Sequence, residues 1–256
     1  MSNLHGRSFD SAAWNTLRRG IVRVARAALP QRCALCVAPA RDELLCRDCA
    51  RTLEHLPPAC PRCALPTPGG SICGACLRAP PPFVASVAAL TYAFPVDRLL
   101  QELKYGGRLA LADWAAQALV AALAAEFSRR PPARRPDRVI AVPLAPARQR
   151  HRGFNQAREI ALQVAAAFDL PIVDSLMRTR AADGTAQASL PWSARARNVR
   201  GTFLAKGEMA GARVALVDDV MTTGATLAEA ARTLLRAGAL EVECWVVART
   251  LPPSVA

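Results

Sequence analysis

Lysine, aromatic side chains and long apolar runs are all scarce in this chain of 256 residues. Only Lys104 and Lys206 are lysines, so 31 of the 33 basic residues are arginines, and the formal net charge is +13. This charge favours a polyanionic partner, nucleic acid above all, or a ligand with several phosphates. Aromatic residues make up 5% of the chain. So few stacking surfaces predict that any contact with nucleic acid is electrostatic and largely independent of sequence.

The chain lacks an uncharged apolar run of the roughly 18 residues that a membrane span requires. In the most apolar candidate helix, residues 109–127, Trp114 and Ala118 repeat at helical spacing, which predicts a buried amphipathic helix. Residues 14–29 mix four arginines with apolar side chains, unlike a secretion signal. We therefore predict a basic helix within residues 1–30 and a cytoplasmic protein that is not integral to a membrane. Peripheral contact with a membrane surface is the alternative for that helix.

Eight of the nine cysteines form four pairs with two residues between the partners: Cys33 and Cys36, Cys46 and Cys49, Cys60 and Cys63, Cys73 and Cys76. Each of the first four recurs 27 residues later, so residues 33–49 and 60–76 are two copies of one unit. One pair places two thiolates on a metal, and a second pair completes a tetrahedral four-sulfur site. We predict two structural zinc ions rather than disulfides or redox-active pairs. The repeat favours four consecutive cysteines on each zinc, whereas an interleaved arrangement is the alternative.

The most informative segment is a short apolar strand, residues 214–217, that runs into two acids, Asp218 and Asp219. A turn rich in hydroxyl groups follows, and Gly224 within it allows the backbone to approach a ligand closely. Amides at the start of the next helix would bind a phosphate. The carboxylates would repel a bare phosphate, so they suit ribose hydroxyls or Mg²⁺. Together the two parts predict a ribose 5-phosphate site, the alternative being an ordinary strand, turn and helix.

This segment resembles the phosphoribosyl diphosphate (PRPP) motif of type I phosphoribosyltransferases. The resemblance and the nearby basic residues predict a set of PRPP-binding residues: Lys104, Arg148, Arg150, Asp218, Asp219, Val220, Met221, Thr222, Thr223, Gly224, Ala225 and Thr226.

Strands alternate with helices in the second half of the chain. The expected strands are residues 84–92, 138–142, 214–217 and 243–248, and the expected helices are residues 95–103, 109–127, 156–168 and 226–237. This alternation predicts an α/β fold with a mostly parallel sheet covered by helices on both faces. Ligands of such sheets bind at the carboxyl ends of the strands. We expect three regions: the basic helix, a double zinc ribbon and a phosphoribosyltransferase-like domain, at residues 1–30, 31–80 and 83–256.

Two further segments carry polar residues. In the predicted basic loop, residues 146–155, three arginines would bind a pyrophosphate through bidentate hydrogen bonds, Asn155 would cap the next helix, and His151 is expected to be solvated. The other segment contains Thr185, Gln187, Ser189, Arg195, Asn198 and Gly201. It is either a mobile lid or an ordinary surface loop.

These motifs, in this order, resemble the ComF family. The matching residues are Leu103 to Tyr105, Pro143 and Leu144, Arg152 to Gln156, Thr185 to Gln187, Arg195, Asn198, Gly201 and Val217 to Thr226. The four cysteine pairs look like that family's double zinc ribbon, and the match covers about residues 31 to 250. The resemblance implies a phosphoribosyltransferase-type fold. It also implies a role in natural competence, where the family is implicated in bringing incoming single-stranded DNA into the cytoplasm.

Two functions follow from these motifs. In the first, the chain binds PRPP or ribose 5-phosphate with Mg²⁺ and handles single-stranded DNA, together with other competence or DNA-processing proteins. The alternative is an active phosphoribosyltransferase of nucleotide metabolism with an unknown acceptor and no DNA role. The expected catalytic residues are Asp218, Asp219 and Arg152. The expected DNA contacts are Arg148, Arg150, Arg152, Phe154 and Arg195, with Tyr105 or Trp192 as stacking surfaces.

Overall fold

A computed structural model describes four stretches of the chain: residues 31–41, 43–179, 201–207 and 209–252. The described residues divide into two compact units, the first ending at Thr52 and the second beginning at Leu53. The second cysteine copy therefore belongs to the same unit as the sheet. The motif-based boundaries of the three expected regions remain predictions. The expected basic N-terminal helix and the segment from Thr185 to Asn198 lie outside the described residues.

The first unit contains the first cysteine copy and little regular structure. Strand β1 (Gln31–Arg32) pairs antiparallel with β2 (Pro39–Arg41), and the short helix α2 (Arg47–Arg51) follows. Its described buried side chains include Cys33 and Leu45. Such a small core does not hold a fold by itself, and small folds of this kind commonly depend on a metal.

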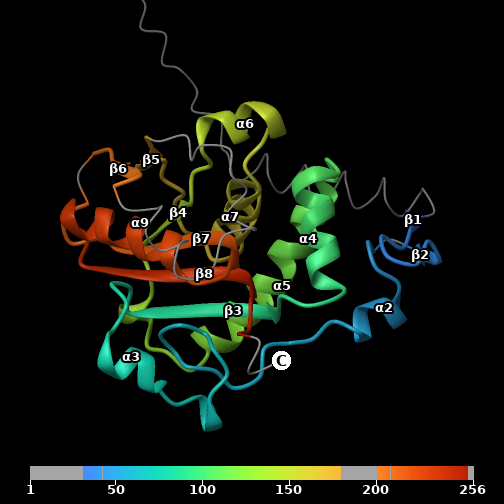
Figure 1. Cartoon of the computed structure of the whole chain (residues 1–256), viewed down its shortest axis with the longest axis horizontal. Helices are drawn as coiled ribbons and strands as arrows, with labels where there is room; N and C mark the ends of the chain where they lie inside the picture. Colours follow the sequence, from blue (N-terminus) through green and yellow to red (C-terminus); the bar gives the residue numbers. More distant parts are fainter. Residues whose placement is uncertain (1–30, 42, 180–200, 208, 253–256) are drawn as a thin grey trace, which may run out of the picture. The chain divides into compact units, whose positions relative to one another are not determined.

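The second unit is built on a four-stranded parallel sheet in the order β3, β8, β7, β4. These strands are β3 (Ala85–Thr91), β8 (Glu241–Arg249), β7 (Arg213–Met221) and β4 (Arg138–Ala141). The two central strands, β7 and β8, are buried along most of their length, as is usual for parallel sheets covered on both faces. The predicted parallel α/β sheet is confirmed (Figure 1).

Helices cover both faces of this sheet (Figure 1). On one face, α5 (Ala110–Phe127) packs against β3 and β8, and α7 (Gln156–Ala167) packs against β7 and β4. Helix α4 (Val96–Tyr105) packs on α5. On the other face, α9 (Ala225–Arg236) packs against β7 and β8. Alternate residues of β8 show this division, since Cys244 joins the core beneath α9 while Trp245 contacts Phe127 of α5.

Helix α5 is long and apolar enough to cross a membrane by length and composition alone. In the fold, however, it packs against α7 and two strands. Its buried residues include Leu111, Leu119 and Leu123, whereas the face predicted from Trp114 and Ala118 is only partly buried. That prediction of the buried face was wrong. The helix is apolar on nearly every side, so spacing alone did not identify the face that meets the sheet.

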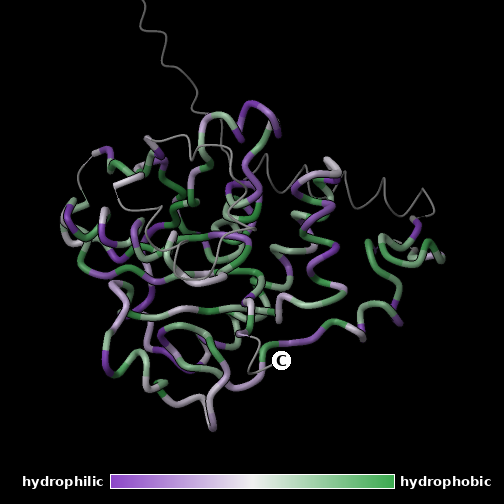
Figure 2. Tube along the Cα trace, viewed as in Figure 1, coloured by the Kyte–Doolittle hydropathy of each residue, from purple (hydrophilic) through white to green (hydrophobic). Residues whose placement is uncertain are grey.

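Two local predictions differ from the structure. Strand β7 continues to Met221, so Asp218 and Asp219 lie within the strand, near its carboxyl end, and do not follow it. The predicted basic loop is instead a short helix, α6 (Pro146–Arg152), which is strongly hydrophilic in Figure 2. Proline at the first helical position and Gly153 in the left-handed conformation after the last favour this helix locally.

The described part of the second unit also contains smaller elements. Strand β5 (Leu176–Arg178) pairs antiparallel with β6 (Phe203–Ala205), and β6 packs next to α9. Short 3-10 helices occur at η1 (Pro68–Gly70) and η2 (Pro132–Arg134), and α3 (Gly74–Arg78) lies within the second cysteine copy.

Backbone segment 54–62 ties the second cysteine copy to β3, one of the two outer strands of the sheet. The amide of Thr91 donates to the carbonyl of Glu54, and the amide of Ser86 donates to the carbonyl of Pro61, both at 2.9 Å. The hydroxyl of Ser86 also donates to the carbonyl of Arg62, at 2.6 Å. These bonds occupy polar groups that an outer strand would otherwise leave exposed. The second copy is therefore part of the sheet's architecture.

Candidate functional site

The eight paired cysteines form two clusters of four, as the 27-residue repeat predicts. One cluster is Cys33, Cys36, Cys46 and Cys49, and the other is Cys60, Cys63, Cys73 and Cys76. Within each cluster the sulfur atoms lie within 4.8 Å of one another. The Cys36–Cys46 and Cys63–Cys73 sulfur distances are both 3.7 Å. Tetrahedral zinc with bonds of about 2.3 Å separates its sulfurs by roughly 3.8 Å, while a disulfide needs about 2.05 Å. Both clusters fit zinc, with consecutive ligands.

The repeat extends to the backbone and to the thiol chemistry. The amide of Cys33 donates to the carbonyl of Ala38 at 2.7 Å, and the amide of Cys60 donates to that of Leu65 at 2.8 Å, 27 residues later. Burial acts to raise the pKa of both thiols, but hydrogen bonds from backbone amides lower it, to about 6 for Cys33 and about 7 for Cys60. Each cluster thus contains one thiol that ionises readily, which favours metal binding.

A buried arginine links the second cluster to the turn after β7. Arg249, the last residue of β8, is 2% exposed. Its Nε donates to the carbonyl of Cys63 at 2.8 Å. Its Nη1 donates to the carbonyls of Met221 and Thr250, both at 2.9 Å, and to that of Thr222. One guanidinium therefore holds together a zinc-ligand loop and the start of the predicted phosphate turn.

Asp218 and Asp219 have different environments although they are adjacent. The Lys104 ammonium at the end of α4 lies 2.6 Å from Oδ2 of Asp219, and both side chains are largely buried. Burial acts to lower the pKa of Lys104, but the Asp219 carboxylate outweighs it and raises that pKa. For Asp218, burial and then the charge of Asp219 raise the pKa to about 8. Asp219 is therefore the acid that pairs with Lys104, while the raised pKa of Asp218 favours its protonated form.

The turn after β7 forms a hollow with Asp218. The hollow is lined by Asp218, Val220, Met221, Thr222, Gly224, Ala225, Thr226 and Leu227. Gly224 has a φ of 77°, a conformation that a side chain would strain. The amide of Ala225, the first residue of α9, donates to the hydroxyl of Thr223 at 3.2 Å. The positive end of the α9 dipole also favours an anion here. Most of the predicted PRPP residues therefore lie together around one hollow.

The arginines of α6 have separate surroundings. Arg150 is exposed. Arg152 donates to Oε1 of Gln156, and its guanidinium carbon lies 5.2 Å from the centre of the Tyr105 ring. Arg148 is partly buried and acts electrostatically on Arg178, a residue that Asp218 also influences. Among the described arginines of α6, Arg148 is thus the one that these interactions connect to the acids.

Other predictions around α6 have mixed outcomes. The predicted cap is confirmed, since Oδ1 of Asn155 accepts from the amide of Ala157 at 3.1 Å at the start of α7. Phe154 is partly buried. Arg195, an expected DNA contact, lies outside the described residues.

Sequence reasoning missed two buried arginines, Arg178 and Arg249. Each is the last residue of its strand, β5 or β8. Ligand sites of parallel sheets lie at the carboxyl ends of the strands, so the place of Arg249 at the end of an apolar strand is a usable signal. Strand β5 belongs to a separate antiparallel pair, so the local pattern does not distinguish Arg178 from a surface arginine.

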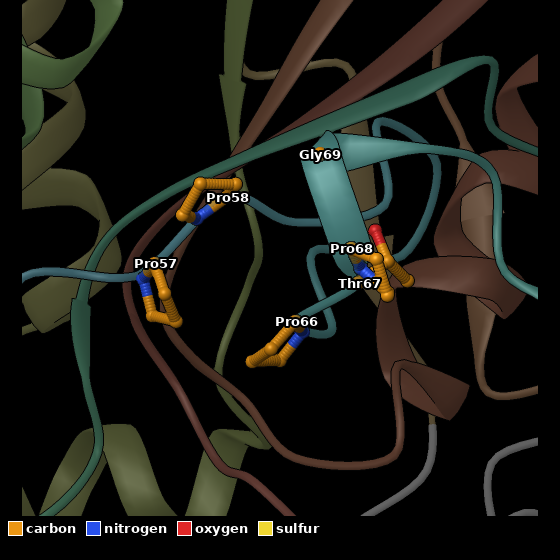
Figure 3. Close-up of a pocket in the computed structure, with 6 residues that line it drawn as sticks. All are labelled: Pro57, Pro58, Pro66, Thr67, Pro68 and Gly69. Carbon is orange, nitrogen blue, oxygen red and sulfur yellow. The ribbon is translucent and has the colours of Figure 1, made fainter.

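A second hollow, larger than the one beside Asp218, lies away from the acids, on the second cysteine copy. It has a volume of about 390 Å³ and is lined by Pro57, Pro58, Pro66, Thr67, Pro68 and Gly69 (Figure 3). No charged side chain lines it. The chemistry that the sequence predicts therefore belongs to the smaller hollow beside Asp218.

Comparisons with known proteins agree with this architecture. Residues 24–77 match the double zinc ribbon domain, and residues 117–252 match the phosphoribosyl transferase domain. DNA utilization protein YhgH of Salmonella typhi is 36% identical over 227 residues, covering 87% of this chain and 99% of that protein. Competence protein F of Haemophilus influenzae is 31% identical over 214 residues, covering 80% of this chain and 90% of that protein.

The chain also has similar solved structures. One is the glutamine PRPP amidotransferase from B. subtilis, complexed with ADP and GMP. It is 25% identical, with a TM-score of 0.38, and the match covers 57% of this chain and 30% of that one.

The sheet, the turn into α9 and the two four-cysteine clusters define a protein with a phosphoribosyltransferase-type fold and a double zinc ribbon. Its relatives over most of the chain are DNA utilization and competence proteins. The chain belongs to the ComF family.

Proposed function

We propose that this protein binds PRPP or ribose 5-phosphate, with Mg²⁺, in the hollow beside Asp218, and that it handles single-stranded DNA during DNA uptake. One observation carries the first part: Asp218 and the turn that opens α9 line the same hollow. A phosphate on the turn and ribose hydroxyls on the acids would occupy the two halves of one ligand.

The carboxylates suit a magnesium ion that arrives with the ligand. Mg²⁺ prefers oxygen ligands and is commonly held by one or two carboxylates together with substrate phosphates. Asp218 and Asp219 would hold it and the ribose 2′- and 3′-hydroxyls. The cation would neutralise part of the pyrophosphate charge. Lys104 already forms an ion pair with Oδ2 of Asp219, which leaves Asp218 as the carboxyl that exchanges its proton for the ligand.

A transferase reaction remains the alternative function of this site. Breaking the C1–O bond of PRPP leaves the electron pair on the departing pyrophosphate and positive charge on the ribose ring, and a lone pair of the acceptor then forms the new bond to C1. Residues 222–226 would hold the 5-phosphate, and Arg148 would stabilise the leaving group. The predicted catalytic role of Arg152 stays a proposal, because its guanidinium contacts Gln156 and Tyr105. Release of pyrophosphate on addition of candidate acceptors would distinguish this function from binding alone.

The described surface of α6 supports the DNA part of the proposal. Tyr105 is 76% exposed, and the Arg152 guanidinium lies over its ring, a pairing of cation and aromatic ring that suits an unpaired base and its phosphate. Arg150, on the same short helix as Arg152, is exposed. The names of the relatives, DNA utilization protein and competence protein, agree with this role. We propose a cytoplasmic location, with competence or DNA-processing proteins as partners and peripheral membrane contact as the alternative.

Isothermal titration calorimetry tests the ligand site. PRPP with Mg²⁺ is titrated into the wild-type protein and the double variant Asp218→Asn/Asp219→Asn, both containing two zinc ions per chain. We expect saturable binding to the wild type and none to the variant. Asp174→Asn, which changes an exposed acid paired with Arg158, is the control and keeps the wild-type affinity. Failure of folded wild-type protein to bind would refute the ligand site.

Fluorescence anisotropy with a labelled single-stranded oligonucleotide tests the DNA role. Arg150→Gln should weaken binding and lower the salt dependence of log K by about 0.7, the value for one lost phosphate contact on a single strand. Arg158→Gln, on α7, removes the same charge away from α6 and should leave that slope unchanged. Equal effects of the two variants would show that the arginines act through net charge and not through a site on α6.

A further inference from the structure

Helix α4 carries an exposed face that its packing in the fold does not use. The helix packs on α5 (Figure 1), and its buried residues form an apolar side: Val96, Leu99, Leu100 and Leu103. The exposed residues lie between these positions and at the end of the helix: Arg98, Gln101, Glu102 and Tyr105. Since the apolar side already holds the helix in place, its exposed side chains are available to a partner.

Two aromatic rings lie at the ends of this exposed face. Tyr105, the last residue of α4, is 76% exposed, and Phe94, two residues before the helix begins, is 73% exposed. All other aromatic side chains in the described part of the chain are buried or partly buried. Burial of an aromatic ring is strongly favourable, so two rings that the fold leaves in water suit contact with a ligand or a partner.

The residues between the two rings are polar and follow helical spacing. Four exposed side chains occur at intervals of four, three and four positions and form the α4 row: Phe94, Arg98, Gln101 and Tyr105. Such intervals place side chains in one line along a helix. The amide of Asp97 donates to the carbonyl of Ala93 at 3.0 Å, so helical hydrogen bonding already spans Phe94. At 1.5 Å per residue the row is about 16 Å long, which matches about five nucleotides at a spacing of 3.4 Å.

Positive charge accompanies the α4 row. Arg98 lies within it, and Arg108 follows three positions after Tyr105; both arginines are exposed. Arg152 of α6 lies over the Tyr105 ring, with its guanidinium carbon 5.2 Å from the ring centre. An arginine on an aromatic ring offers a phosphate contact beside a stacking surface. The charge of the row is therefore complementary to a polyanion.

Separate rings with an arginine between them fit a single strand better than a protein. A protein interface has a contiguous apolar centre, whereas Arg98 and Gln101 separate Phe94 from Tyr105. Unpaired bases stack one at a time on aromatic rings, and arginines bind the phosphates that link them. In a duplex the bases stack on one another and cannot reach the rings. The row therefore favours unpaired nucleic acid.

We propose that single-stranded DNA binds along the α4 row, with one base stacked on Phe94, another on Tyr105, and the intervening phosphates on Arg98. This inference rests on the proposed DNA role and extends its surface from α6 onto α4. Arg152 joins the two parts, because it belongs to α6 and lies over the Tyr105 ring. Glu102, an exposed acid of the same helix, opposes the strand by repelling its phosphates.

Loss of either ring should weaken the binding of a labelled oligonucleotide, measured by fluorescence anisotropy on zinc-loaded full-length protein. Phe94→Ala and Tyr105→Ala should each weaken it by about 5- to 150-fold, the range for one base stacked on an aromatic side chain. Tyr105→Phe keeps the ring and should bind as tightly as the wild type. Leu240→Ala is the control, because it removes an exposed apolar side chain just before β8. It should keep the wild-type affinity.

An abasic strand of equal length separates stacking from charge, because it has the same phosphates and no bases. Phe94→Ala should leave the affinity for the abasic strand unchanged. Arg98→Gln should weaken binding of both strands and lower the salt dependence of log K by about 0.7, the value for one phosphate contact. Glu102→Gln removes a charge that repels phosphate and should strengthen binding of both strands.

The outcomes distinguish the α4 row from the proposed DNA role. If the wild type binds single-stranded DNA and neither ring variant weakens that binding, the row is refuted, while the DNA role stands on the arginines of α6. Equal weakening of the base-containing and abasic strands would show that the rings act through the fold, and also refutes the row. Wild-type protein that binds no single-stranded DNA refutes the proposed DNA role itself.

The substitution Phe94→Trp gives a direct readout of stacking that a structural role would not produce. The variant keeps an aromatic ring at the same exposed position, so it should bind the strand at least as tightly as the wild type. A base stacked on the new indole should quench its fluorescence, measured as the difference from wild-type protein. The base-containing strand should produce this quenching, and the abasic strand should not. A variant that binds the strand without additional quenching would overturn the proposal.

Discussion

The two four-cysteine clusters have the same local structure and different surroundings. Both repeat the same cysteine spacing, the same sulfur distance of 3.7 Å and the same backbone hydrogen bonds, 27 residues apart. The first belongs to the small unit that ends at Thr52, while the second belongs to the unit of the sheet. There its Cys63 carbonyl shares Arg249 with the turn after β7. Units with the same cysteine spacing thus acquire different surroundings, because only the second is built into the unit of the sheet.

Loss of a zinc ligand should produce the largest difference between the two clusters. Cys73→Ser should remove the second zinc, lower the melting temperature of the sheet unit by about 10 °C or more, and abolish PRPP binding, because structural zinc contributes several kcal/mol to folding. Cys46→Ser should remove the first zinc and leave PRPP affinity within about twofold, as for independent sites. Zinc content, thermal unfolding and calorimetry measure the three effects. Equal loss of PRPP affinity in both variants would contradict the comparison.

Arg249→Met tests the link between the second cysteine cluster and the turn after β7 while leaving every cysteine in place. The variant removes a donor from four backbone carbonyls, of which that of Met221 still accepts from the amide of Thr250. Each buried group left unpaired costs about 1–3 kcal/mol. We expect a lower melting temperature and PRPP affinity weakened by about tenfold or more, the equivalent of roughly 1.4 kcal/mol, with two zinc ions still bound per chain. Arg249→Lys should restore part of the affinity. Arg236→Met, at the exposed end of α9, is the control. Unchanged PRPP affinity in Arg249→Met would show that the turn does not depend on this arginine.

The pH dependence of stability is a third property in which the two units should differ, because Asp218 belongs to the unit of the sheet. Its pKa is about 8 in the folded protein, whereas the ordinary pKa of an aspartate is 3.8. Between these values the folded state keeps a proton that the unfolded state loses, so stability falls as pH rises from about 4 to 8. Asp218→Asn removes this loss. Its melting temperature should exceed that of the wild type by more at pH 9 than at pH 5, in the absence of ligand. A difference that does not vary with pH would contradict the raised pKa.

The smallest effect concerns two residues at equivalent positions of the repeat. Val37 and Ala64 follow the second cysteine of each copy and have φ angles of 64° and 55°, a conformation that side chains disfavour. Replacement by glycine relieves about 1–2 kcal/mol of strain, partly offset by the greater freedom of glycine in the unfolded chain. Ala64→Gly should change the free energy of unfolding of the sheet unit, and Val37→Gly should leave that free energy unchanged. Hydrogen exchange resolves the two units. An effect of Val37→Gly on the sheet would show that the units unfold together.

Local patterns predicted much of this protein correctly. The spacing of the cysteines indicated two four-sulfur clusters, because a short loop forces neighbouring thiols together whatever the rest of the chain does. The alternation of strands and helices indicated the parallel sheet, and Asn155 was recognised as a helix cap. Helix α6 was missed because its residues lack an apolar stripe. Its proline start and its glycine end were the available signals.

The sequence alone therefore determined the metal clusters, the strand and helix order and the pairing of two acids with a glycine turn, because each depends on residues close together in the chain. Only the tertiary structure decided that Lys104 pairs with Asp219, that Arg249 joins the second cluster to the turn after β7, and that Arg178 is buried beside Phe203. Those relations join residues up to 186 positions apart. Burial and electrostatic range follow from the packing of distant segments, so no local pattern carries them.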